Sequence, residues 1–286
     1  MKKFTVFSLI LAIVLVISAC GSKNNTNEGS ANGTNAAANA NTTDTAGTGA
    51  SQEVKKIIVG TGTQFPKVCF LDENGKLTGF DVELVKEIDK RLAGYEFELQ
   101  TMDFANLLLS LDTKKIDFVA HEMEKNPERE EKYLFNKEAY AHWKNKIVVA
   151  KDNDTIKTLD DLAGKKVLTG ATSAEAQILE NYNKDHDKKI NIVYQSGAAN
   201  DTVSQLTTGR VDATLAADFS LSLIDPQGKL KTVGEPLSDA EILFVFRKND
   251  ADDQKLSDAI DEAIKEIKAD GTLSKLSTTW LGQDYT

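Results

Sequence analysis

The sequence predicts an α/β protein built from two similar units. Between residues 55 and 120, short apolar runs alternate with segments of helical periodicity, and the same alternation returns between residues 146 and 216. Strands and helices that alternate along a chain build mostly parallel sheets covered by helices. The chain has 286 residues, of which 41% are apolar and 27% charged, so it is long and apolar enough for two such cores. Ligands of these folds bind beyond the carboxyl ends of the parallel strands.

The N-terminus has the pattern of a lipoprotein signal peptide. Lys2 and Lys3 precede an uncharged run of 16 residues, Phe4 to Ala19, which is short for a membrane span. The run ends in the letters VISACG, which resemble a bacterial lipobox with cleavage before Cys20 and lipid attached to its thiol. An ordinary secretory cleavage site and an uncleaved anchor are the alternatives. We therefore expect residues 1–19 to be a signal peptide and Cys20 to carry acyl chains, palmitate included, that hold the protein on a membrane.

Residues 20–53 are predicted to be the lipidated cysteine and a tether. Between residues 21 and 50 no apolar side chain is larger than alanine, and only three residues are charged. Such a segment cannot form a core, and 30 residues of flexible chain reach about 30 Å. The formal charge of −10, which becomes −12 without Lys2 and Lys3, excludes nucleic acid as the expected partner. The second cysteine, Cys69, has no partner once Cys20 is lipidated, so no disulfide framework is expected.

The first predicted unit alternates strand and helix from Lys56 onward. The helix that begins at Phe80 has apolar residues at intervals of three to four, with lysine and glutamate opposite them. Turn residues at 72–75 separate it from the preceding strand. The expected strands are 56–61, 68–71, 97–102 and 116–120, and the expected helices are 80–92 and 104–111.

The second predicted unit repeats this order after Tyr140. Its expected strands are 146–150, 166–169, 190–194 and 211–216, and its expected helices are 159–164, 174–183 and 201–208. The run Ile242 to Phe246 is typical of one fully buried strand. The longest helix follows, with an apolar stripe from Leu256 to Ile267, and a short terminal helix carries Trp280.

The segment from Ile116 to Glu131 leads from a strand into a helix whose start could bind an anion. Asn126 suits the N-cap, Pro127 suits the first helical position, and Arg129 lies inside the first turn. A helix N-terminus beside an arginine offers backbone N–H groups and a planar fork for a carboxylate. The glutamates at 128, 130 and 131 allow the alternative of a self-capped surface helix with Arg129 in an ion pair.

Several motifs, in order, resemble the polar amino acid substrate-binding proteins of ABC importers, family 3 of the bacterial solute-binding proteins. The resemblance covers roughly Lys55 to Gly282. Within the family, the run His121 to Phe135 most resembles the cystine and sulphur amino acid binders of Gram-positive bacteria. The motifs are GFDVEL at 79–84, NPER at 126–129, LDDLAGKKV at 159–167, GRVDA at 209–213, and ADGTLSK at 269–275 leading to WLG at 280–282.

The resemblance implies a periplasmic-binding-protein-like fold of type II. Its first lobe would contain residues 54–140 and return at 241–286, and its second lobe would contain residues 144–239. Two crossings, near Ala141 to Trp143 and at Ala240, would form a hinge about which the lobes close on the ligand. The implied protein is a monomer on the outer face of a Gram-positive cell membrane. It would bind L-cystine or a related sulphur amino acid, without a cofactor or metal, and deliver it to the permease subunits.

The resemblance also assigns roles to individual residues. Arg129 falls on the arginine that grips the ligand α-carboxylate. Thr172 and Ser173 match residues of the second lobe that bind the same carboxylate from a helix N-terminus. Phe65 matches an aromatic residue that covers the ligand, and Phe104 matches a second one; packing in the core is the alternative for both.

The receptor of the ligand ammonium departs from the family pattern. Relatives place an aspartate five residues after the aspartate of the GRVDA motif, but this chain has Ala217 there and Asp218 one residue later. A slip of one residue turns a strand side chain to the opposite face, so a bulge would be needed to aim Asp218 at the ligand. Glu122 or Glu124 could receive the ammonium instead, and together with His121 they stand where relatives have small or amide residues. Acids in the cleft favour a ligand with an additional ammonium or several N–H donors.

Three other functions are weighed against this one. A zinc-protease motif is excluded because Lys125 stands where the second histidine of the motif is required after His121. A dehydratase of the same fold would need a general acid, for which Glu122 or Glu124 could serve. A different polar amino acid or a small peptide could replace cystine as the ligand.

Overall fold

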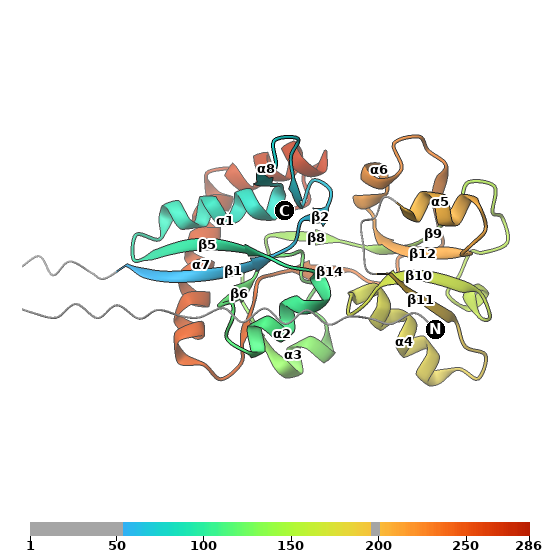
Figure 1. Ribbon diagram of the computed structural model, residues 1–286, viewed down its shortest axis with the longest axis horizontal. Coiled ribbons are helices and arrows are strands. Elements are labelled where there is room, and N and C mark those ends of the chain that lie inside the picture. The colour runs from blue at the N-terminus through green and yellow to red at the C-terminus, as the bar shows by residue number, and fades with distance from the viewer. Residues whose placement is uncertain (1–53, 196–200) are drawn as a thin grey trace, which may run out of the picture. The chain divides into compact units, whose positions relative to one another are not determined.

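The computed structural model describes residues 54–195 and 201–286. The predicted signal peptide, Cys20 and tether lie outside the described residues. The described residues belong together in one compact part of the chain. Within the described ranges, none of the helices is both long and apolar enough to cross a membrane. The α/β alternation predicted from the sequence is confirmed, and it builds two separate five-stranded sheets (Figure 1).

The first sheet has the strand order β5-β1-β6-β15-β7. Its strand β1 pairs in parallel with β5 and β6, and β15 runs antiparallel to β6 and β7. Strand β15, which lies between β6 and β7, thus comes from the C-terminal part of the chain. The bounds are β1 Lys55–Thr61, β5 Tyr95–Thr101, β6 Phe118–Val119, β7 Tyr133–Phe135 and β15 Val245–Arg247.

The second sheet has the strand order β11-β10-β12-β9-β13. Strand β10 pairs in parallel with β11 and β12, whereas β9 runs antiparallel to β12 and β13. The carboxyl ends of β10 and β12 therefore open on the same edge, as those of β1 and β6 do in the first sheet. The bounds are β9 Asn145–Ala150, β10 Lys166–Gly170, β11 Asn191–Gln195, β12 Ala213–Ala217 and β13 Leu230–Val233.

Helices cover both faces of each sheet, and each face has its own apolar cluster. In the first unit, α1 and α7 pack on one face through residues such as Leu84 and Ile260, and α2 packs on the other through Leu107. In the second unit, α4 contributes Leu179 to one face and α5 contributes Leu206 to the other. The α-helices are α1 Phe80–Arg91, α2 Leu107–Asp112, α3 Pro127–Lys132, α4 Ala174–Asp185, α5 Thr202–Thr207, α6 Ser220–Ile224, α7 Ala251–Ala269 and α8 Thr272–Leu281.

Two antiparallel strands run between the sheets in Figure 1. These are β8, Ala141–Trp143, and β14, Ala240–Ile242, which pair with each other. They lie at the residues named above as the two crossings, whose role as a hinge stays a prediction. A small antiparallel meander precedes α1 and is formed by β2 Gln64–Phe65, β3 Cys69–Leu71 and β4 Leu77–Thr78. The short 3-10 helices are η1 Phe104–Asn106 and η2 Asp160–Leu162.

The single buried strand predicted at 242–246 is wrong. The segment contains the end of β14 and the start of β15, which pair with different partners. Between them, the Phe244 N–H donates to Asn136 Oδ1 at 2.8 Å, so the backbone leaves one ladder before it joins the next. Because Ile242 through Phe246 are all buried, the apolar pattern of the sequence does not reveal this break.

Candidate functional site

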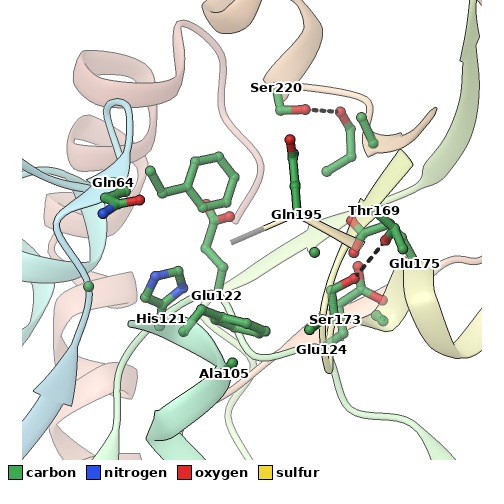
Figure 2. Close-up of a pocket in the computed structure, with 18 of the residues that line it drawn as sticks. Gln64, Ala105, His121, Glu122, Glu124, Thr169, Ser173, Glu175, Gln195 and Ser220 are labelled. Carbon is green, nitrogen blue, oxygen red and sulfur yellow. Dashed lines mark hydrogen bonds between the residues drawn. The ribbon is translucent and has the colours of Figure 1, made fainter. Parts of the chain in front are cut away.

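A cavity of about 360 Å³ lies where the two sheets present their strand ends (Figure 2). On the side of the first sheet, the cavity is lined by the segments that follow β1, β5 and β6, by Arg129 of α3 and by Trp143 of β8. The second sheet contributes the ends of β10, β11 and β12 and the starts of α4 and α6. A cavity of this size is in the range that small-molecule ligands occupy. We call the two sides the first wall and the second wall.

Arg129 reaches the first wall from α3. The Asn126 side chain caps this helix by accepting a hydrogen bond from the Arg129 N–H at 2.9 Å, and Pro127 begins it, both as predicted. The guanidinium is 7% exposed and donates to the carbonyl oxygens of Glu124, at 2.7 Å, and Thr172, at 3.0 Å. Burial lowers the pKa of Arg129, and the carboxylates of Glu124 and Glu175 oppose that shift. Two of its five N–H donors are thus committed to backbone, which leaves others for an anion in the cavity.

Glu122 is held in a strained position in the first wall. Its φ of 46° lies in the left-handed region, which costs a non-glycine residue about 1 kcal/mol or more. The conformation is fixed by its N–H, which donates to Asp81 Oδ2 at 2.6 Å. Its side chain is 9% exposed and lines the cavity, and Oε1 has no hydrogen-bond partner. Burial raises the pKa of Glu122 well above its usual value, and the charges of Asp81, Glu175 and Glu124 add to that effect.

Glu124 lies beside Arg129 and is better satisfied. Its Oε1 accepts hydrogen bonds from Trp143 Nε1 at 3.2 Å and Asn145 Nδ2 at 2.6 Å. Burial raises the pKa of Glu124 to about 7, and the charge of Glu175 contributes, while the two hydrogen bonds and Arg129 act in the opposite direction. A cation that enters the cavity would therefore favour the ionised form of this carboxyl group.

Asp81 supports the first wall through its hydrogen bond with Glu122, and only its place in the GFDVEL motif distinguishes it in the sequence. It is fully buried on α1 and accepts from the Glu122 N–H and from the Tyr140 hydroxyl, which lies 3.2 Å away. Its other oxygen, Oδ1, has no partner. Burial raises the pKa of Asp81 to about 7, although both hydrogen bonds lower it.

The predicted aromatic residues and His121 line the cavity together. The Phe104 ring lies 4.9 Å from the His121 ring, and the Phe65 ring lies 6.2 Å from it. Phe65 also stacks on Phe219 at 6.0 Å, so it packs as well as lining the cavity. Burial lowers the pKa of His121 to about 4, so the imidazole is neutral at pH 7. This cluster gives the first wall an apolar surface next to its charged groups.

Thr172 and Ser173, predicted as a pair, occupy different positions. Ser173 caps α4 by accepting from the Ala176 N–H at 3.0 Å, and its hydroxyl lies 3.2 Å from Thr169 Oγ1 in the cavity wall. Thr172 has φ 64° and an exposed side chain that does not line the cavity. Its carbonyl oxygen, not its hydroxyl, accepts from Arg129 and links the two walls.

The structure does not bring Asp218 to the cavity. Strand β12 ends at Ala217, which lines the cavity, and Asp218 is the exposed residue that follows it. No bulge re-aims its side chain, because the alternation of the strand continues through Ala216 and Ala217 in register with β9. Glu122 and Glu124 remain as the acids that were predicted and that line the cavity.

Sequence reasoning missed several lining residues on the second wall, above all Glu175. It is the second residue of α4 and directly follows the hydroxyl-rich turn. Acids are common in the first turn of any helix, so nothing in the sequence distinguishes this one. The amides of Gln64 and Gln195 and the hydroxyl of Ser220 also line the cavity (Figure 2).

Comparisons with known proteins agree with this architecture. The model of the family "Bacterial extracellular solute-binding proteins, family 3" matches residues 57–283. The L-cystine-binding protein TcyK of Bacillus subtilis is 48% identical over 289 residues, covering 100% of this chain and 98% of the relative. The L-cystine-binding protein TcyJ of the same organism is 48% identical over 239 residues, or 82% of this chain and 87% of the relative. A solved structure described as a putative L-cystine ABC transporter from Listeria monocytogenes has a TM-score of 0.77 and 51% identity, covering 82% of this chain and 98% of that one.

Proposed function

This chain belongs to family 3 of the bacterial extracellular solute-binding proteins and has their type II periplasmic-binding fold, and from that premise we propose that it binds L-cystine or a related sulphur amino acid and delivers it to an ABC permease. The observation that carries the proposal is Arg129, a buried guanidinium in the cavity wall beside Glu124. The cystine-binding names of the two Bacillus subtilis relatives support the choice of ligand.

Arg129 and Glu124 are proposed to hold the amino acid end of the ligand. An α-carboxylate and an α-ammonium are attached to the same carbon, so their receptors must be neighbours. The Glu124 carbonyl accepts from Arg129 Nη1, which places the two residues side by side, and their charges act on each other. Charge-assisted hydrogen bonds are worth about 1.5 to 3 kcal/mol each, whereas micromolar binding needs about 8 kcal/mol, so other contacts must contribute.

The remaining free energy is proposed to come from the apolar cluster and the start of α4. Phe65 and Phe104 offer aromatic surface to the carbon and sulphur atoms of the ligand, and sulphur packs favourably on aromatic rings. Ser173 and the backbone at the start of α4 face the cavity from the second wall, where a carboxylate is favoured. His121 acts as a neutral hydrogen-bonding group and Glu122 as a further acid.

The two sheets are proposed to be lobes that close on the ligand. The lobes are residues 54–140 with 241–286, and residues 144–239, and the paired strands β8 and β14 serve as the hinge. Three hydrogen bonds between described side chains or carbonyls join the lobes: Arg129 Nη2 to the Thr172 carbonyl, Asn145 Nδ2 to Glu124 Oε1, and Asn181 Nδ2 to Glu128 Oε1 at 2.9 Å. A ligand bound between the walls would add contacts to both and favour the closed state.

The N-terminal segment is proposed to anchor the protein. Cleavage after residue 19 would leave Cys20 as the acylated first residue, and residues 21–53 would tether the lobes to the outer face of a Gram-positive membrane. The protein would act there as a monomer. The dehydratase alternative is disfavoured, because the matched family and both relatives are binding proteins.

Calorimetric titration of the purified protein with the twenty amino acids, L-cystine and glutathione tests the proposal. The expected result is a dissociation constant for L-cystine in the micromolar range or below, at least tenfold tighter than for any of the twenty amino acids. Heat from another amino acid but none from cystine would assign the ligand to the alternative class. The absence of binding by every compound of the panel would overturn the proposal.

A further inference from the structure

The second wall of the cavity has a markedly different charge composition from the first. Among the described lining residues, the first wall contributes Arg129 and three acids, Asp103, Glu122 and Glu124, whereas the second wall contributes Glu175 as its one charged side chain. The other residues of the second wall are small, hydroxyl-bearing, amide or apolar. A charged group of a ligand that reaches this wall therefore meets a carboxylate.

Glu175 makes no hydrogen bond or ion pair with another described residue, although its side chain is half-buried and lines the cavity. Figure 2 shows it close to Thr169 and Ser173, with Glu122 and His121 on the opposite side of the cavity. Its position in the first turn of α4 is favourable for any acid, and this accounts for its charge. Helix stability does not explain why this acid faces the cavity, because an acid on the outer surface of the first turn would stabilise α4 equally well.

The cavity holds more acid than one amino acid end requires. One ammonium needs one carboxylate receptor, and Glu124 beside Arg129 fills that role. Three lining acids are left over: Asp103, Glu175, and Glu122, which is 9% exposed and has an unpartnered Oε1. The charge of Glu175 acts on both other glutamates and on Arg129, so all four groups share one electrostatic environment. A second ammonium in the cavity would relieve this repulsion.

We propose that Glu175 receives a second ammonium group, so that the cavity selects ligands with two amino acid ends over ligands with one. This inference rests on the proposed function and names its specificity-determining residue. The Cα atoms of the two halves of a disulfide are about 4.4 to 6.8 Å apart, so both ammonium groups of one cystine molecule fall within a single cavity. One end binds Arg129 and Glu124 of the first wall, and the other end is held by Glu175 of the second wall.

The test compares ligands that differ by one ammonium. L-Cystine is paired with the mixed disulfide of cysteine and 3-mercaptopropionate, which keeps both carboxylates and the disulfide. A second pair, 2,6-diaminopimelate and 2-aminopimelate, lacks sulphur. Each is titrated calorimetrically into the purified wild-type protein, the Glu175→Gln variant and an Asp185→Asn variant. Asp185 is an exposed acid at the far end of α4, so its variant changes the net charge equally without touching the cavity.

The wild type and Asp185→Asn are expected to prefer the ligand with two ammonium groups by about tenfold or more, which corresponds to about 1.4 kcal/mol. Glu175→Gln is expected to lose that preference while its affinity for the ligand with one ammonium stays within about twofold. An equal loss for both members of a pair, or an undiminished preference, overturns the inference and leaves the proposed function intact. If cystine fails to bind the wild type, the proposed ligand is wrong, and the preference between the two pimelates then decides the role of Glu175 alone.

Discussion

The two walls of the cavity achieve their polarity in different ways. The first wall carries most of its charged groups in buried, constrained positions: Arg129 is 7% exposed, Glu122 has a left-handed backbone, and the fully buried Asp81 accepts a hydrogen bond from the Glu122 N–H. The second wall offers a helix start, hydroxyl groups and the half-buried Glu175. Substitutions in the first wall should therefore change folding stability and ligand affinity together, whereas substitutions in the second wall, apart from the N-cap Ser173, should act mainly on affinity.

The largest effect is expected from Arg129→Ala. The change removes the charge-assisted bonds proposed for the ligand carboxylate and also the one cationic side chain among the described residues that line the cavity. The affinity for L-cystine should fall about 100-fold, since such bonds are worth about 1.5 to 3 kcal/mol. Calorimetry measures this, with Arg210→Ala as the control because Arg210 is exposed and outside the cavity. An unchanged affinity would remove Arg129 from the site.

A second large effect, on folding stability rather than on ligand affinity, concerns Asp81 and pH. Its pKa in the folded protein is about 7, against 3.8 for an ordinary aspartate, so the folded state binds the proton more tightly than the unfolded state. The resulting stabilisation is complete below about pH 4 and is lost as the pH rises through 7. A shift of about three pH units corresponds to roughly 4 kcal/mol in the free energy of unfolding.

Asp81→Asn should make the stability less dependent on pH. Asparagine can still accept hydrogen bonds from the Glu122 N–H and the Tyr140 hydroxyl, but it carries no charge at any pH. Urea unfolding of the unliganded protein at pH 5 and pH 8 measures the difference, with Asp185→Asn as the control for net charge. A variant whose stability falls between these pH values as steeply as that of the wild type would show that Asp81 does not cause the slope.

The contrast between the walls also decides what the sequence could predict. The capping of α3 was predictable because Asn126, Pro127 and Arg129 are close neighbours in the sequence. The resemblance of the NPER motif predicted that Arg129 contacts the ligand, and in the structure Arg129 lines the cavity. The role of Asp81 could not be predicted, because its partner Glu122 is 41 residues away in the sequence. In the sequence, Glu175 looks like any acid in the first turn of a helix, and only the fold shows that it lines the cavity. The break between β14 and β15 was hidden because every residue from Ile242 to Phe246 is buried and apolar.

Ser173→Ala and Thr172→Ala should separate the two residues of the turn. Ser173→Ala removes the N-cap of α4 and a hydroxyl from the cavity, so it should cost about 1 kcal/mol of stability and weaken cystine binding several-fold. Thr172→Ala keeps the carbonyl that accepts from Arg129 and should change the affinity less than twofold. Calorimetry and thermal unfolding of both variants measure this. A larger loss of affinity in Thr172→Ala than in Ser173→Ala would reverse the assignment.

The smallest effect is expected from Asp218→Asn, and it tests the second wall most directly. Asp218 and Glu175 are acids of the same unit, but Asp218 is exposed beyond the end of β12, whereas Glu175 faces the cavity. At 0.15 M salt, an exposed charge is screened over about 8 Å, so removing it should change the affinity for L-cystine by less than twofold. A loss as large as that of Glu175→Gln would mean that closure of the lobes turns Asp218 inward, and the strand, rather than α4, would then supply the ammonium receptor.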